Sequence, residues 1–275
     1  MATEAPQRFS APAWYSLGAM APPHGNRLLS RKDIEEFFER GVDTHLPGLC
    51  VICAVFGFHD PHLSLLLAKW KGVNLWSLPG GYVLRRESLD AAARRVLYVH
   101  TGIRTEHLTQ FRTFGGPNRT GAKLRSFYAT LGIRVPADAW PFRRIVTVGY
   151  YALVDSRKIR ARTDYMLDVC GWYPMNGRPR LAFNHEQATR LALEALRGRL
   201  GAPAAGVSLL PKRFTMPELQ HLHEAVLGTR LDRRNFQKRM LEGGRLERLA
   251  ERRQGGAHRA PYLYRFRSDR PQDDF

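Results

Sequence analysis

Residues 80–103, GGYVLRRESLDAAARRVLYVHTGI, carry charged side chains at a spacing that could serve phosphate chemistry. A glycine turn leads through Glu87 into a segment of helical periodicity that holds Arg95 and His100. Hydrolysis of a diphosphate commonly uses Mg²⁺ or Mn²⁺, which are hard cations that bind oxygen ligands. Glu87 and His100 alone would hold such a cation poorly, so this stretch does not by itself predict a metal site.

The same stretch resembles the Nudix box, G-x5-E-x7-R-E-U-x-E-E-x-G-U, where U is a bulky aliphatic residue, and LWSLPGG before it resembles the family's lead-in. The matching positions are Gly81, Glu87, Arg95, Leu97, Gly102 and Ile103. Three glutamates of the box are replaced by Val96, Val99 and His100. Those glutamates hold the metal in active members. The resemblance therefore implies a Nudix fold with no catalytic residue, no metal and no cofactor, in which Glu87 pairs with Arg95.

One alternative stays open at this point. The chain could be an active Nudix hydrolase that cleaves a nucleoside diphosphate derivative. In that case Glu87 and His100 would share the metal with an acid from elsewhere, such as Glu106.

A second candidate site lies near the C-terminus. Residues 214–228, FTMPELQHLHEAVLG, are predicted to be helical, and Thr215 and Glu218 fit a capping box at the start of the helix. Residues 231–244 form a short basic helix, and residues 246–267 read as a basic hairpin around two glycines. A helix, a turn, a basic helix and a basic hairpin make the layout of a winged helix-turn-helix.

The second of these helices has two distinct faces. At 100° per residue, Phe236 and Met240 share the face that should pack on the domain core. Arg234, Asn235 and Lys238 point away from it and suit base edges in a major groove. The complete set of expected DNA contacts is Lys212, Arg213, Arg233, Arg234, Asn235, Lys238, Arg239, Arg252, Arg253 and Arg259.

The charge of the chain favours a polyanionic partner. Its net charge is +18, and residues 197–275 hold 17 Lys and Arg against 9 Asp and Glu. A non-specific nucleic-acid or RNA-cap binder that uses this field is a further alternative. No apolar run is long enough for a membrane span, and the N-terminus does not read as a signal peptide, so we expect no membrane association and a cytoplasmic location.

The sequence predicts a tail and two domains, and each domain contains one of these two sites. Residues 1–29 read as a flexible tail, residues 30–200 as a Nudix-like domain and residues 207–268 as the winged helix-turn-helix. The expected fold class is α/β (α+β), with a mixed sheet and helices. Residues 115–142 are expected to be a loop. Cys50 and Cys53 lie on a predicted strand, where residues three apart face opposite sides and cannot share a bridge or a metal.

Residues 209–241, LLPKRFTMPELQHLHEAVLGTRLDRRNFQKRML, resemble the C-terminal winged helix of Nudix-related transcriptional regulators. That family includes the repressor of NAD biosynthesis and sugar-responsive repressors of the arabinose type. Residues 181–196 are similar to the helix that joins the two domains in the family, and the resemblance covers about residues 44–267. It implies a homodimeric transcriptional regulator, a repressor or an activator, that binds a palindromic operator in double-stranded DNA and senses a small-molecule effector.

The effector is expected to lie between the sheet and the Nudix-box helix, near LWSLPGG. An aromatic wall with a few polar groups suits a sugar or an ADP-ribose-like nucleotide. Similarity of LPGLCVICAVFGFHD and NLWSLPGGYVL to the sugar-type branch favours a sugar slightly. The candidate ligand-binding residues are Phe56, Trp76, Arg94, His100, Phe114, Arg119 and Tyr151.

Overall fold

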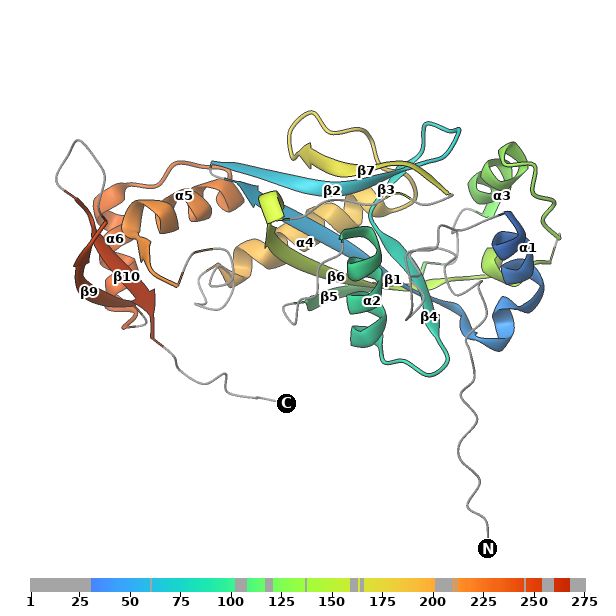
Figure 1. Cartoon of the computed structure of the whole chain (residues 1–275), viewed down its shortest axis with the longest axis horizontal. Helices are drawn as coiled ribbons and strands as arrows, with labels where there is room; N and C mark the ends of the chain where they lie inside the picture. Colours follow the sequence, from blue (N-terminus) through green and yellow to red (C-terminus); the bar gives the residue numbers. More distant parts are fainter. Residues whose placement is uncertain are drawn as a thin grey trace, which may run out of the picture.

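The computed structural model describes residues 31–59, 61–101, 108–116, 121–136, 138–158, 163, 166–200, 210, 212–244, 246–253 and 260–267. Its elements lie along one long axis (Figure 1). A large sheet occupies the middle, two short helices lie at one end, and a helical unit with a hairpin lies at the other. No helix in the described part of the chain is long and apolar enough to cross a membrane.

Seven strands form the large sheet, and their pairing confirms the expected mixed sheet. They are β1 (His45–His59), β2 (His62–Trp70), β3 (Trp76–Ser77), β4 (Gly80–Leu84), β5 (Thr109–Phe114), β6 (Val146–Asp155) and β7 (Leu167–Pro174). The order is β3-β2-β1-β6-β5, with β4 also paired to β1 and β7 to β2. β1 and β6 run parallel, whereas the other paired strands are antiparallel.

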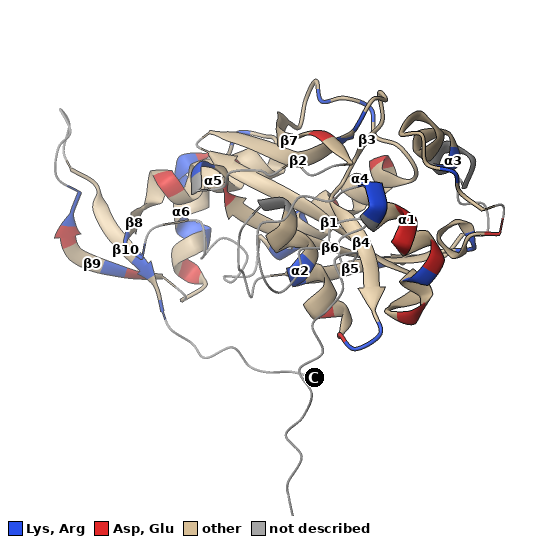
Figure 2. Ribbon diagram, turned by 45° about the vertical axis from the view of Figure 1, so that its right-hand side comes forward, with Lys and Arg blue, Asp and Glu red and all other residues tan. Residues whose placement is uncertain are grey.

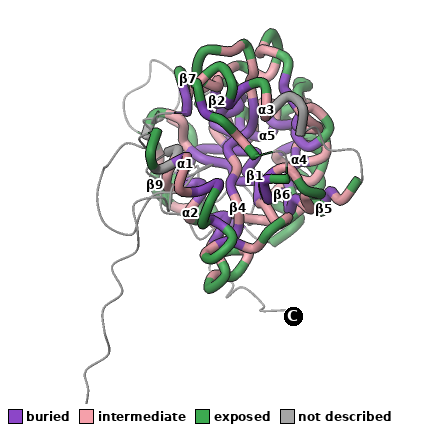
Figure 3. Tube along the Cα trace, turned by 90° about the vertical axis from the view of Figure 1, so that its right-hand side faces the viewer, coloured by how far each residue is buried: buried purple, intermediate pink, exposed green. Residues whose placement is uncertain are grey.

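The sheet lies between two helices. The buried side chains of β1 point alternately to the two faces of the sheet, so each face needs a helix to cover it. One face packs against α2 (Leu89–Thr101) and the other against α4 (His185–Arg199) (Figure 1). The residues toward α2 are Val51, Cys53 and Val55. The residues toward α4 are Ile52, Ala54 and Phe56. Buried residues accordingly concentrate in the central strands (Figure 3).

A third core joins elements from distant parts of the chain at one end of the sheet. It combines α1 (Arg31–Arg40), α3 (Gly121–Thr130) and a short 3-10 helix (Trp140–Phe142). The expectation of a loop over residues 115–142 was therefore wrong for these two elements. Aromatic packing from outside the segment stabilises them, for example Phe38 against Tyr128 at 4.8 Å between ring centroids. Two further 3-10 turns are Gly41–Asp43 and Ser156–Lys158.

The C-terminal part has the expected order of elements. It consists of β8 (Phe214–Thr215), α5 (Met216–Leu227), α6 (Arg233–Glu242), β9 (Leu246–Arg252) and β10 (Tyr262–Phe266), with strand order β8-β10-β9. The capping box is confirmed, since the Thr215 hydroxyl accepts from the Glu218 backbone and the Glu218 carboxylate accepts from the Thr215 backbone. The glycines expected to turn the hairpin lie outside the described residues.

The first helix of this part shares its core with the large sheet. Leu222 and Val226 of α5 are completely buried and belong to the same apolar cluster as Leu196 of α4. Arg197 of α4 also donates its Nε–H to the Val226 carbonyl at 2.9 Å. The apolar cluster thus crosses the boundary that the sequence predicts between the two domains.

His45 lies where the third core meets β1. Its ring is fully buried, contacts the Gly41 carbonyl at 3.0 Å and stacks on Trp140 at 5.8 Å between centroids. Burial lowers the pKa of His45 to about 4, and the nearby charge of Arg95 acts in the same direction. The imidazole is therefore neutral in the folded protein at physiological pH.

This burial predicts acid sensitivity of the fold. The unfolded chain takes up the His45 proton near pH 6.5 and the folded chain only near pH 4, so stability is full above pH 6.5 and falls as the pH drops. Urea denaturation should show about 2 kcal/mol less stability at pH 5 than at pH 7 from this group. His45→Gln should lack that component. An identical pH dependence in both proteins would contradict the assignment.

Candidate functional site

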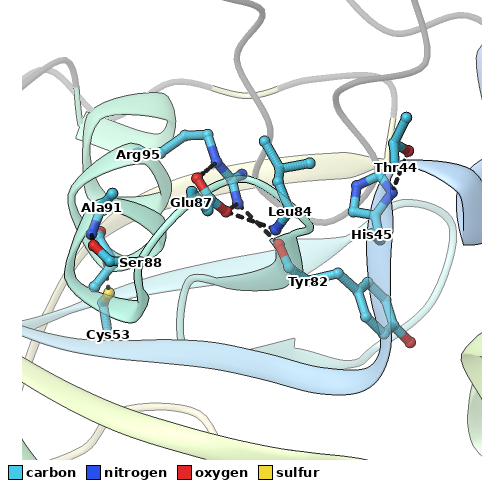
Figure 4. Close-up of polar contacts among 10 residues, drawn as sticks. Thr44, His45, Cys53, Tyr82, Leu84, Glu87, Ser88, Ala91 and Arg95 are labelled. Atoms are coloured by element: carbon cyan, nitrogen blue, oxygen red, sulfur yellow. Dashed lines mark hydrogen bonds and ion pairs between the residues drawn. The ribbon is translucent and has the colours of Figure 1, made fainter.

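Glu87, the acidic residue retained from the box, is held by neighbouring groups (Figure 4). Its Oε1 accepts from Arg95 Nη2 at 2.6 Å and from the Leu84 backbone N–H at 2.8 Å. Its Oε2 accepts from Arg95 Nε at 3.0 Å, and Arg95 also donates to the Tyr82 carbonyl at 2.8 Å. The expected pairing of Glu87 with Arg95 is confirmed. The bidentate pair fixes the loop before α2 to the middle of that helix.

The valines of the box serve packing on the inner side of α2. Val96 is completely buried with Ala92 and Ala93, and Val99 is half-buried. Cys53 lies below them, where burial raises the pKa of its thiol to about 12. Among the described residues, no three His, Cys, Asp or Glu side chains come together as a metal site would require. The side chain of His100 and all of Glu106 lie outside the described residues.

Four of the expected ligand-binding residues come together, but on the other face of the sheet. Phe56, Phe114 and Tyr151 are buried in the cluster beneath α4, and Trp76 packs against the same cluster. Arg94 is exposed on α2, across the sheet. These four aromatic residues therefore do not line a pocket between the sheet and α2, contrary to the position expected for them. Arg119 and the side chain of His100 lie outside the described residues.

The loop next to the box is tied to the start of α4. His185 Nδ1 accepts from the Leu78 backbone N–H at 3.0 Å, and the Ala182 N–H donates to the Trp76 carbonyl at 2.8 Å. The Trp76 ring meets Tyr173 edge-on at 4.9 Å. His185 and Tyr173 were not among the expected residues. No sequence signal near either residue points to a contact about a hundred positions away.

The basic helix α6 has the two faces that its sequence predicts. Phe236 is almost fully buried and Met240 packs beside it in the C-terminal core. The opposite side is exposed and carries Arg233, Arg234, Asn235, Lys238 and Arg239. The Asp232 carboxylate caps the helix by accepting from the Asn235 backbone at 2.9 Å. The helix thus exposes cationic and amide side chains to solvent. Figure 2 marks the Lys and Arg positions of α6 in blue.

The basic residues around the hairpin have more varied environments. Arg213 pairs with Glu251, and Arg253 pairs with the capping residue Glu218. Arg252 donates to the Tyr262 hydroxyl at 2.6 Å. These three expected DNA contacts are therefore held by partners within the same unit. Lys212 is exposed, whereas Arg259 lies outside the described residues.

Known proteins are similar to the C-terminal unit alone and to most of the whole chain. The family profile of the NrtR DNA-binding winged helix domain matches residues 206–266. The chain is 28% identical over 227 residues to the ADPR responsive transcriptional repressor NtrR of Acinetobacter baylyi, covering 80% of this chain and 82% of that protein. Both the C-terminal unit and the large sheet domain fall within these similarities.

Solved structures show the same arrangement. Shewanella oneidensis NrtR, alone and complexed with a 27mer DNA, is 27% identical, with a TM-score of 0.59 over 80% of this chain; the match covers 94% and 93% of those chains respectively. A MutT/nudix family protein from Enterococcus faecalis, 21% identical, has a TM-score of 0.59 over 88% of this chain and 100% of its own, which shows the fold alone.

The geometry of Glu87 predicts a structural role that can be measured. Glu87 and Arg95 are both largely buried, at 12% and 14% side-chain exposure, so Glu87→Gln should lower the free energy of unfolding by about 1–3 kcal/mol. Glu194→Gln removes the carboxylate of an exposed pair with Arg190 and should cost less than about 0.5 kcal/mol. Chemical denaturation compares the two. Equal, negligible losses would show that Glu87 does not support the fold.

Proposed function

Because the chain belongs to the NrtR-like family of Nudix-related regulators, we propose that it is a transcriptional repressor whose DNA affinity is set by a small molecule bound to the Nudix domain. The observation that carries this proposal is the exposed cationic face of α6, anchored by Phe236 within a segment that matches a DNA-binding domain family. Its place of action would be the cytoplasm.

The DNA contact would centre on α6. Arg234, Asn235 and Lys238 would reach base edges in the major groove, where arginine suits guanine and asparagine suits adenine. Arg233 and Arg239 flank them and would bind phosphates. The Shewanella relative was solved in complex with a 27mer DNA, which supports DNA as the partner. Two copies of the chain, as a homodimer, would place two such helices on a palindromic operator.

The proposed effector is ADP-ribose or a closely similar nucleoside diphosphate. The Acinetobacter relative is named for its response to ADPR, and its similarity spans most of both chains. That similarity outweighs the slight preference for a sugar that the sequence alone indicates. Bound ligand would be retained rather than cleaved, because Val96, Val99 and His100 occupy the positions where the Nudix box has its metal-binding glutamates.

Helix α4 would provide a path between the loop around Leu78 and the unit that carries α6. Its first residue, His185, holds the Leu78 backbone beside the Nudix box, and its last turn supports α5 through Arg197 and Leu196. Its 15 residues span about 22 Å at the usual helical rise. A ligand that shifts the loop around Leu78 would move α4 and, with it, the unit that carries α6. To act as an effector it must bind one arrangement more tightly than the other.

The DNA-binding proposal is tested on α6. A preferred site is first selected from random duplexes, and affinities are then measured by fluorescence anisotropy. Arg234→Ala and Asn235→Ala should each weaken binding to that site by roughly 5- to 150-fold, because each removes a base contact. Arg190→Ala removes an equally exposed helical arginine on α4 and should leave the affinity nearly unchanged. Equal effects of all three substitutions would contradict recognition through α6.

The effector proposal is tested with ADP-ribose and with free pentoses. At a concentration one hundred times its Kd, ADP-ribose should add about 2.7 kcal/mol to the stability of the folded protein and raise its Tm, whereas pentoses should not. Incubation with Mg²⁺ or Mn²⁺ should release no AMP. Steady AMP release would instead support the hydrolase alternative. A rise in Tm with pentoses but not with ADP-ribose would support a sugar effector.

A further inference from the structure

The hairpin of β9 and β10 carries arginines in two different environments. On one side, Arg265 pairs with Glu247 at 2.8 Å and Arg213 pairs with Glu251. The charges of these four side chains cancel locally. As exposed ion pairs they contribute little to stability, and they add no net positive surface for a polyanion.

On the other side, two arginines share one aromatic ring. The guanidinium carbons of Arg248 and Arg252 lie 4.7 Å and 4.1 Å from the centroid of Tyr262. The positions agree with the strand register, which places Tyr262 opposite Arg252, and with the four-residue spacing that puts Arg248 on the same side of β9. No carboxylate among the described residues pairs with either guanidinium, so this side keeps its positive charge.

The two guanidinium groups differ in how many hydrogen bonds they donate within the protein. Arg252 donates to the Tyr262 hydroxyl at 2.6 Å and to the Ala260 carbonyl at 3.3 Å, and its side chain is half-buried. Arg248 is exposed, and it donates no hydrogen bond to any acceptor that the structure describes. Its five N–H donors can therefore face a ligand while the ring restrains the plane of the group.

We propose that Arg248 is a DNA-phosphate contact of the wing, and that Tyr262 and Arg252 are the residues that position it. Stacking on an aromatic face stabilises a guanidinium and reduces the rotamer freedom that it loses on binding, without using its N–H groups. Arg252 orients the ring through the hydroxyl and does not itself reach the DNA. This inference rests on the proposed DNA-binding function and assigns the wing contact to a residue absent from the expected set.

The test is the salt dependence of DNA binding, measured with the full-length protein. Arg248→Ala should weaken binding to the selected site and to random duplex by the same factor, about three- to ten-fold, and lower the slope of log Kd against log salt by about one. Arg265→Ala is the matched control, because it removes the same charge from the other side of the hairpin. It should leave the slope nearly unchanged.

Two further variants test the positioning roles. Tyr262→Phe keeps the ring but removes the hydroxyl through which Arg252 orients it. It should therefore lower the slope by less than Tyr262→Leu, which removes the ring and should lower the slope as Arg248→Ala does. Thermal melts check that each variant is folded. If Tyr262→Leu does not fold, Arg248→Ala still tests the proposal, because Arg248 is exposed and its removal should not disturb the fold. An unchanged slope in Arg248→Ala, with the wild type still preferring its site, overturns this inference and leaves the proposed function standing. A wild type without any preferred site overturns both.

Discussion

The buried contact between α4 and α5 is the constraint on which the rest of the molecule depends. Leu222 and Val226 are fully buried in the apolar cluster that also contains Leu196 and its neighbours on α4. Arg197 adds a directional bond to the Val226 carbonyl, close to the end of α5. Separating the two parts would expose these apolar side chains, at roughly 1.5–3 kcal/mol for each. The sheet domain and the winged helix are therefore mechanically linked.

The residues of the stretch that resembles the Nudix box serve packing and support. Glu87 and Arg95 brace the loop through hydrogen bonds to backbone groups of Leu84 and Tyr82. Val96 extends the apolar inner side of α2, where a carboxylate would have to be buried beside Cys53. An ionised carboxylate at that depth would be costly without a cation to balance it. Val96 thus contributes to a well-packed inner side of α2.

Local sequence patterns predicted the features that depend on nearby residues. The capping box at Thr215, the two faces of α6 and the pairing of Glu87 with Arg95 all arise within eight positions along the chain. The helix at 121–130 was missed, because glycine and proline flank it and its stabilising partners, such as Phe38, lie far away in sequence. Likewise, the intradomain partners of Arg213 and Arg253 appear only when the hairpin is folded against α5.

Helix α4 would couple the proposed effector-binding domain to the DNA-binding unit. The most direct test of this coupling measures the Kd for the preferred DNA site with and without saturating ADP-ribose, in the wild type, in Arg197→Ala and in the control Arg190→Ala. In the wild type and the control, we predict a ligand-dependent change in Kd of about 5- to 150-fold. Arg197→Ala should still bind DNA and ADP-ribose separately, but the change in the Kd for DNA that ADP-ribose causes should be much smaller. Undiminished coupling in that variant, or none in the wild type, would contradict the account.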